Sequence, residues 1–275
     1  MRLDPLLAGR ALAAASLAFA SCAGPHPTLV THLHGHNDYL QLHPLRTALQ
    51  LGLHSVEADV FLVEGELRVG HERWQLRSGR TLTAMYLAPL REHVQQHGGR
   101  ALADAEPFVL LIDIKADADA VHAQLQRELG PFHAMLTHFV DGRIELGAVT
   151  VLLSGARPRA QLEGQRDRWC ALDGRPADLD AVPQPPVDLV PWISEAWSRV
   201  SDWTGSDELM AEERQRVQQL AARVHAQGRQ LRFWGAPDRP EAWQALRELG
   251  VDRIGTDRPK VAAAWLRDAS VASPR

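Results

Sequence analysis

Short apolar runs alternate with helical patterns through most of this chain, and this alternation constrains the fold more than any other feature. Runs with strand character occupy residues 28–34, 55–62, 107–115, 148–155, 168–174, 187–194, 230–236 and 252–257, and 66–71 extends the second run. Helical patterns lie at 44–52, 83–97, 117–129, 207–227 and 260–268, and in the stretch that ends at 250. Strands that alternate with helices in this way predict a parallel sheet covered by helices.

The number and length of these runs separate two parallel-sheet folds. About eight strands over about 245 residues match a closed (β/α)8 barrel. The run "PFVLLIDIK" at 107–115 is continuously apolar up to its end, which is typical of a strand buried on both faces. No G-x-G-x-x-G or phosphate-loop pattern follows the first strand, which disfavours a doubly wound sheet. We therefore predict an α/β fold with a single TIM-barrel domain over 27–268.

Residues 1–22 have the pattern of an export signal. "MRLDPLLAGR" carries two arginines, and the ten-residue apolar run "ALAAASLAFA" is too short to span a bilayer. "FASCAG" then resembles a bacterial lipoprotein box with Cys22 as the acylated residue, although Phe19 stands where Leu is usual. Plain cleavage near this point and a cytoplasmic start are the alternatives. We expect an exported bacterial protein, either periplasmic or anchored in the membrane as a lipoprotein.

Charge and cysteine content limit the ligands and the chemistry that we expect of this chain. A net charge of −4 gives no reason to expect nucleic acid as a ligand. The second of the two cysteines, Cys170, lies in the strand-like "RWCALDG", so we expect an inert core thiol rather than a nucleophile.

Polar side chains recur at the ends of the predicted strands, where TIM barrels carry their catalytic groups. Residues two apart in a strand share one face. The pairs and end residues are His34 and His36, Glu57 and Asp59, His71, Asp113 and Lys115, Arg232 and Trp234, and Asp257.

The acids interrupt runs that should otherwise be buried. A lone buried carboxylate costs several kcal/mol unless it is paired or binds a metal. Three acids directed at one point repel each other, and a divalent cation would resolve that repulsion. Oxygen ligands without cysteine indicate Mg²⁺ or Ca²⁺. The histidines then remain available for proton transfer near neutral pH.

The motifs "HGHNDY", "SVEADV", "EGELRVGHE", "LLIDIK", "RFW" and "GVDRIGTDRP" occur in this order. Together they resemble the phosphatidylinositol-specific phospholipase C-like phosphodiesterase superfamily, which includes glycerophosphodiester phosphodiesterases and sphingomyelinase D. The opening H-N-D-Y is most similar to the branch with the altered-inheritance-of-mitochondria proteins. The resemblance covers essentially all of the chain after the leader.

This resemblance implies a role for each matching position. His36 and His71 match the catalytic histidines, and Glu57, Asp59 and Asp113 match the metal ligands. Lys115 matches a lysine that contacts the substrate phosphate, and Trp234 matches an aromatic residue of the pocket wall. The implied activity is metal-dependent cleavage of a glycerophosphodiester or (lyso)phospholipid, with the two histidines as general acid and base. Attack by a substrate hydroxyl would give a cyclic phosphate.

The chain departs from glycerophosphodiesterases at two points. Asn37 and Asp38 replace the Arg-Gly that follows the first histidine in that family, so a phosphate-binding arginine is missing. We therefore assign Asn37 to substrate binding. Too few residues follow His71 for the subdomain that the family inserts there. Both departures leave the substrate open.

Two other interpretations remain. A zinc amidohydrolase-like barrel would use His34 and His36 on the first strand and Asp257 on the last. That chemistry needs further histidines at the ends of middle strands, whereas only His225 follows His138, inside a predicted helix. The third interpretation is a non-catalytic lipoprotein that binds a phosphorylated ligand.

Overall fold

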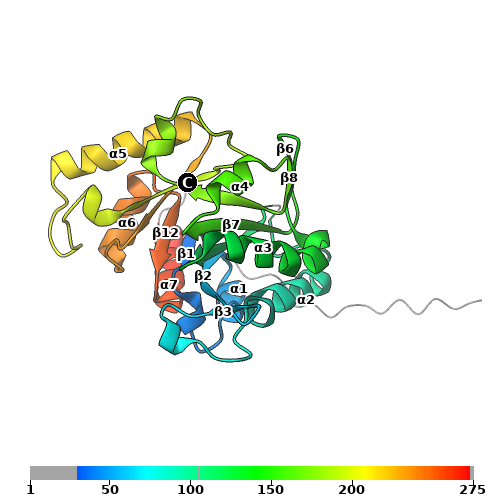
Figure 1. The fold of residues 1–275 in the computed structure, drawn as a ribbon. Helices are drawn as coiled ribbons and strands as arrows, with labels where there is room; N and C mark the ends of the chain where they lie inside the picture. Colours follow the sequence, from blue (N-terminus) through cyan, green and yellow to red (C-terminus); the bar gives the residue numbers. More distant parts are fainter. Residues whose placement is uncertain (1–29, 105, 273–275) are drawn as a thin grey trace, which may run out of the picture.

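The protein folds as a closed barrel of eight parallel strands (Figure 1). The structure is a computed structural model and describes residues 30–104 and 106–272. The barrel strands are β1 (Val30–Gly35), β2 (Leu53–Val63), β4 (Phe108–Ile114), β7 (Val149–Gly155), β9 (Cys170–Gly174), β10 (Trp192–Ala196), β11 (Gln230–Trp234) and β12 (Arg253–Thr256). Strand β1 pairs with both β12 and β2, which closes the barrel. The predicted TIM barrel is confirmed.

Helices follow most strands and cover the outside of the barrel (Figure 1). They are α1 (Arg46–Leu51), α2 (Ala88–Gln96), α3 (Ala118–Leu129), α4 (Arg159–Glu163), α5 (Ala211–Ala226), α6 (Pro240–Glu248) and α7 (Pro259–Ala272). Between β9 and β10 the chain forms only a short 3-10 turn, Pro176–Leu179. The strand predicted at 187–194 begins later, at Trp192, because Pro191 has no N–H to donate to a sheet.

Side chains of the barrel strands alternate between two environments. On β2, Val56, Ala58 and Val60 are buried in the core outside the barrel, between strands and helices. The intervening Ser55, Glu57 and Asp59 therefore point into the barrel, where they are also buried. This alternation places the acids of β2 inside the barrel.

The barrel interior is apolar toward the N-terminal ends of its strands. Its cluster contains Val109, Leu111, Leu152, Ala171, Trp192 and Phe139. Phe139 comes from β5 (His138–Val140), the centre of a small sheet with β6 (Arg143–Glu145) and β8 (Asp167–Arg168) that the sequence did not predict. Thr137 N–H donates to the carbonyl of Val149, the first residue of β7, so this sheet lies at the N-terminal ends of the barrel strands. The polar side chains are consequently concentrated at the opposite end.

After β2 the chain turns back, and β3 (Glu66–Val69) pairs with β2 in the antiparallel direction. His71 follows β3 two residues later. Within residues 30–104 and 106–272 no helix has the length and apolarity needed to cross a bilayer. The predicted signal segment 1–22, with Cys22, lies outside the described residues.

Candidate active site

The first predicted catalytic histidine, His36, follows β1 and is held by the end of β12. Its Nδ1 lies 2.8 Å from Asp257 Oδ1. Asn37 adopts a left-handed backbone conformation, φ 49°, which asparagine tolerates better than most residues. Its Nδ2 donates to the same Asp257 oxygen at 3.2 Å. Asp257, a strand-end residue to which the sequence gave a role only in the zinc interpretation, thus orients His36.

Two opposing effects act on His36. Burial alone would lower its pKa, but the hydrogen bond to Asp257 and the charge of Glu57 outweigh burial and raise the pKa above the ordinary value. With Nδ1 directed at a carboxylate, the proton of the neutral ring resides on Nδ1, and Nε2 faces the barrel mouth. His36 Nε2 lies 3.8 Å from Glu57 Oε1.

The second predicted histidine, His71, is held by Asp59. His71 Nδ1 lies 2.8 Å from Asp59 Oδ2. The same carboxylate oxygen receives the ammonium of Lys115 at 2.8 Å and lies 2.8 Å from the hydroxyl of Tyr39. The Tyr39 hydroxyl also lies 2.6 Å from Asn37 Oδ1, so its single proton can be donated either to the residue beside His36 or to the carboxylate that holds His71. The His71 side chain is about half exposed, which leaves its Nε2 edge accessible from solvent.

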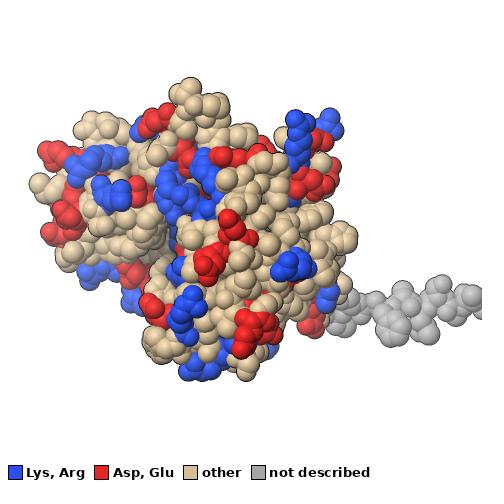
Figure 2. Space-filling model, viewed as in Figure 1, with Lys and Arg blue, Asp and Glu red and all other residues tan. Residues whose placement is uncertain are grey.

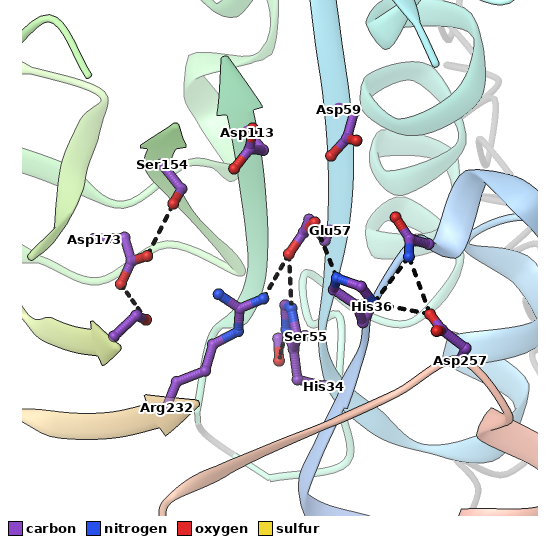
Figure 3. Close-up of polar contacts among 12 residues, drawn as sticks. His34, His36, Ser55, Glu57, Asp59, Asp113, Ser154, Asp173, Arg232 and Asp257 are labelled. Atoms are coloured by element: carbon purple, nitrogen blue, oxygen red, sulfur yellow. Dashed lines mark hydrogen bonds and ion pairs between the residues drawn. The ribbon is translucent and has the colours of Figure 1, made fainter. Parts of the chain in front are cut away.

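Glu57 lies deeper in the barrel, in contact with Arg232 of β11 (Figure 3). Arg232 Nη2 donates to Glu57 Oε2 at 2.6 Å, and both side chains are buried. Burial would raise the pKa of Glu57, but the guanidinium of Arg232 outweighs it and holds the pKa far below its usual range. His34 lies beneath this pair, with Nδ1 2.9 Å from Ser55 Oγ. Burial, together with Arg232, lowers the pKa of His34 to about 4, so this ring is neutral at pH 7.

Asp113 and Lys115 lie at the end of β4, beside Asp59. Asp113 and Asp59 are register partners in the sheet, and Lys115 Nζ lies 3.1 Å from Asp113 Oδ1. Burial raises the pKa of Asp113, and the negative charges of Glu57 and Asp59 raise it further. The positive charge of Lys115 opposes this rise but does not cancel it. Gly155 on β7 makes room for this carboxylate, since a Cβ there would lie 2.6 Å from Asp113 Oδ1.

The predicted metal ligands can be tested against this geometry. Among the described residues, no group of three or more His, Cys, Asp or Glu side chains has the geometry of a metal site. Lys115 and Arg232 contact the oxygens that a cation would use. Even so, Asp59 Oδ1 is buried without a hydrogen-bond partner, and three carboxylates on neighbouring strands share the mouth. This donor set suits a hard divalent cation once the two cationic side chains release their oxygens.

A small cavity of about 70 Å³ lies between the ends of β11 and β12 and reaches His36. Its walls include Arg232, Trp234 and Asp257. Trp234 therefore lines the same cavity as His36. Larger hollows, of about 900 and 640 Å³, lie elsewhere, against α1 and α2 and beside the 183–189 loop.

Comparison with known proteins places this barrel in a family. The model of the AIM6-like phosphodiesterase domain matches residues 27–170, more than half of the chain. The chain belongs to this family. The altered inheritance of mitochondria protein 6 homolog of Arthroderma benhamiae is 28% identical, over 87% of this chain and 87% of that protein. The altered inheritance of mitochondria protein 6 of Eremothecium gossypii is 26% identical, over 83% of this chain and 68% of that protein.

Two solved enzyme structures share the fold of this AIM6-like domain. A glycerophosphodiester phosphodiesterase from Parabacteroides distasonis superposes with a TM-score of 0.52 and 13% identity, covering 90% of this chain and 100% of that chain. A calcium-dependent phosphoinositol-specific phospholipase C from a Gram-negative Pseudomonas superposes with a TM-score of 0.54 and 11% identity, covering 83% and 88%. The chain thus carries an AIM6-like phosphodiesterase domain and shares the barrel fold of these two enzymes.

The predicted bacterial location is wrong. The curated proteins that this AIM6-like chain matches at 26–28% identity over most of its length are fungal. They point to a eukaryotic protein rather than to a periplasmic or membrane-anchored bacterial lipoprotein.

The structure brings the site residues predicted for the AIM6-like domain to one end of the barrel. Hydrogen bonds and ion pairs connect His36, Asn37, Asp59, His71, Asp113 and Lys115, and Glu57 lies beside His36. Sequence reasoning gave no role to Tyr39, Arg232 or Asp173. Tyr39 stood inside the "HGHNDY" motif and Arg232 at a strand end, so both carried a signal that could have been used.

Proposed function

We propose that this AIM6-like barrel cleaves a phosphodiester by general acid–base catalysis between His36 and His71, assisted by a divalent cation. The observation that carries the proposal is the pairing of each histidine with its own carboxylate. Nδ1 of His36 contacts Asp257 and Nδ1 of His71 contacts Asp59, each at 2.8 Å. Such a carboxylate fixes the ring orientation and leaves Nε2 to exchange protons with the substrate.

The two histidines differ in surroundings, and this suggests their roles. Because the Asp257 hydrogen bond and Glu57 raise the pKa of His36, this ring retains its proton closer to neutral pH. We assign His36 to donate a proton to the leaving alkoxide. His71, which is more exposed, would accept the proton of the attacking hydroxyl.

We assign Mg²⁺ or Ca²⁺ to the three acids Glu57, Asp59 and Asp113. When bound, such a cation neutralises charge that develops on the phosphate oxygens. The calcium dependence of the Pseudomonas phospholipase C supports this assignment. Lys115 supplies a second positive group at the same place, because its ammonium already lies between Asp59 and Asp113. We assign that ammonium to a non-bridging oxygen of the phosphate.

The substrate class that fits is a glycerophosphodiester or a (lyso)phospholipid. A glycerophosphodiester and a lysophospholipid each carry a free glycerol hydroxyl near the scissile bond. His71 would activate this hydroxyl to attack the phosphorus, which gives a cyclic phosphate and releases the other alcohol, protonated by His36. The fold similarity to a glycerophosphodiester phosphodiesterase supports this class. Asn37, which contacts His36, and Trp234, which lines the same cavity as His36, would contact the alcohol groups of the substrate.

A phosphodiester panel tests the proposal. We expect His36→Ala and His71→Ala each to lower kcat on a methyl diester of glycerol phosphate, which has a free hydroxyl beside the phosphate and an alkoxide leaving group, by about 10²- to 10⁴-fold. His225→Ala is the matched control, since His225 also pairs with an aspartate, Asp252, at 2.8 Å but lies on α5. Phosphorus NMR with glycerophosphodiesters and lysophospholipids would reveal a cyclic product. Full turnover in both alanine variants would contradict the histidine assignment, and unchanged turnover after chelation would contradict the metal assignment.

A further inference from the structure

A second polar group lies across the barrel mouth from His36, around Asp173 on β9. Strand β9 is opposite β1 in the order of the barrel strands. The Asp173 side chain is fully buried and accepts hydrogen bonds from Ser154 Oγ at 2.9 Å and Ser194 Oγ at 2.5 Å (Figure 3). None of the proposed catalytic steps uses these residues.

Two arginines are anchored on this group. Arg175 Nη1 donates to Asp173 Oδ2 at 3.0 Å, and its Nη2 donates to Ser154 Oγ at 3.3 Å. The centre of the Arg175 guanidinium lies 4.7 Å from the centre of the Trp234 ring. Arg157, which follows β7, donates from Nη1 to the backbone carbonyl of Asp173 at 2.7 Å. Both guanidiniums are thereby fixed at the mouth by buried partners.

Only one of these two arginines is paired with a carboxylate among the described residues. Asp173 forms an ion pair with Arg175, whereas Arg157 forms no ion pair with a carboxylate of the described residues. Burial lowers the pKa of Arg157, and the nearby charge of Arg175 lowers it further. Figure 2 shows Lys and Arg side chains gathered around a hollow between the places that α4 and β12 occupy in Figure 1. Each guanidinium has more N–H donors than the hydrogen bonds described above use, and two such neighbouring groups favour binding of an oxyanion between them.

We propose that Arg157 and Arg175, beside Trp234, bind a second anionic group of the substrate, a carboxylate or phosphate monoester carried by one of its alcohols. This inference rests on the proposed phosphodiesterase function and narrows its substrate. The scissile phosphate lies at His36, His71 and Lys115, and the extra anion lies toward β7 and β9. A substrate with a trimethylammonium head group, such as a choline ester, is repelled from the same place.

Matched chromogenic substrates test this specificity. They are 4-nitrophenyl phosphodiesters whose second alcohol ends in a phosphate, a carboxylate, a methyl ester or a trimethylammonium group. We expect kcat/KM of the wild type to fall from the anionic to the neutral and then to the cationic member. Comparison of the phosphate and carboxylate members shows which oxyanion the arginines prefer.

Substitutions of the two arginines test whether they cause the preference for anionic substrates. Arg157→Gln and Arg175→Gln should each lower kcat/KM about tenfold on the anionic members, as loss of a charge-assisted hydrogen bond predicts. The methyl ester should change less than twofold. Arg199→Gln is the control, because Arg199 follows β10 and its side chain is mostly exposed. Arg175→Lys retains a positive charge beside Asp173 and guards against misfolding of the glutamine variant. Equal loss on the neutral substrate, or a wild-type preference for the cationic one, would overturn the inference.

Phosphate binding provides a readout that does not need turnover. Tryptophan fluorescence titrated with inorganic phosphate should still show binding in a His36→Ala/His71→Ala variant. In Arg157→Gln/Arg175→Gln the part of the binding signal that depends on the arginines should be lost, which leaves only phosphate bound at Lys115. A wild type that binds phosphate through the arginines but cleaves no diester would refute the proposed function and leave the anion site standing. Equal phosphate affinity in the two double variants would refute the anion site itself.

Discussion

Replacing Arg232 with methionine tests the ion pair at the centre of the mouth. The change removes the guanidinium 2.6 Å from Glu57 and leaves a buried carboxylate without its cationic partner. Breaking a buried pair in this way costs about 3 to 5 kcal/mol. We expect the free energy of unfolding, measured by urea denaturation in EDTA, to fall by this amount in Arg232→Met.

A divalent cation should reverse part of this loss if Glu57 is a metal ligand. A ligand that binds only the folded state stabilises it by about 2.7 kcal/mol at 100 times its Kd. In Arg232→Met the cation no longer competes with the guanidinium for Glu57. We therefore expect Ca²⁺ or Mg²⁺ to stabilise this variant more than the wild type.

Arg168→Met is the matched control for this experiment. Arg168 is a buried arginine that forms an ion pair with Asp188, away from the mouth, and its loss should also destabilise the protein. Cations should not selectively rescue it. A loss below about 1 kcal/mol in Arg232→Met, which is the range of exposed ion pairs, would refute the importance of the buried pair. Equal stabilisation of both variants by cations would refute Glu57 as a ligand.

Two further predictions concern titrating groups. Burial raises the pKa of Asp38 from 3.8 to about 6, despite hydrogen bonds from Leu45 N–H and Tyr86 OH. Its contribution to stability is therefore complete below pH 4 and is lost as the pH rises through 6. The difference corresponds to about 3 kcal/mol, so Asp38→Asn should gain about this much relative to the wild type between pH 4 and pH 8 in urea unfolding. A constant difference across this range would contradict it. Asp257→Asn retains a hydrogen-bonding group beside His36 but removes the charge that raises its pKa. The limb of the pH–kcat/KM profile that reports His36 should then move to lower pH, and an unchanged profile would exclude His36 as the titrating group.

The hydrophobic pattern was sufficient to predict the barrel. Eight runs separated by helical patterns leave little choice of topology, because parallel strands need crossover helices. The hydrophobic pattern did not predict the start of β10 or the small sheet around β5. Pro191 delayed the start of β10, and the short strands of the β5 sheet have too few residues to show a period.

The site followed from the same rule, since polar residues at strand ends must meet at one end of a barrel. Sequence spacing placed Glu57 and Asp59 on one face but could not show which partner each carboxylate would take. Arg232 lies 175 positions from Glu57, and Asp257 lies 221 positions from His36, so only closure of the barrel brings them together.

The sequence by itself determined the fold class and the end of the barrel at which its polar residues gather. These properties depend on periodicity and on the order of strands, which the chain carries locally. Only the tertiary structure decided the ion pairs, the orientation of each histidine and the arginines grouped around Asp173. Those depend on distances across the barrel mouth, where side chains from strands far apart in sequence compete for the same carboxylate oxygens.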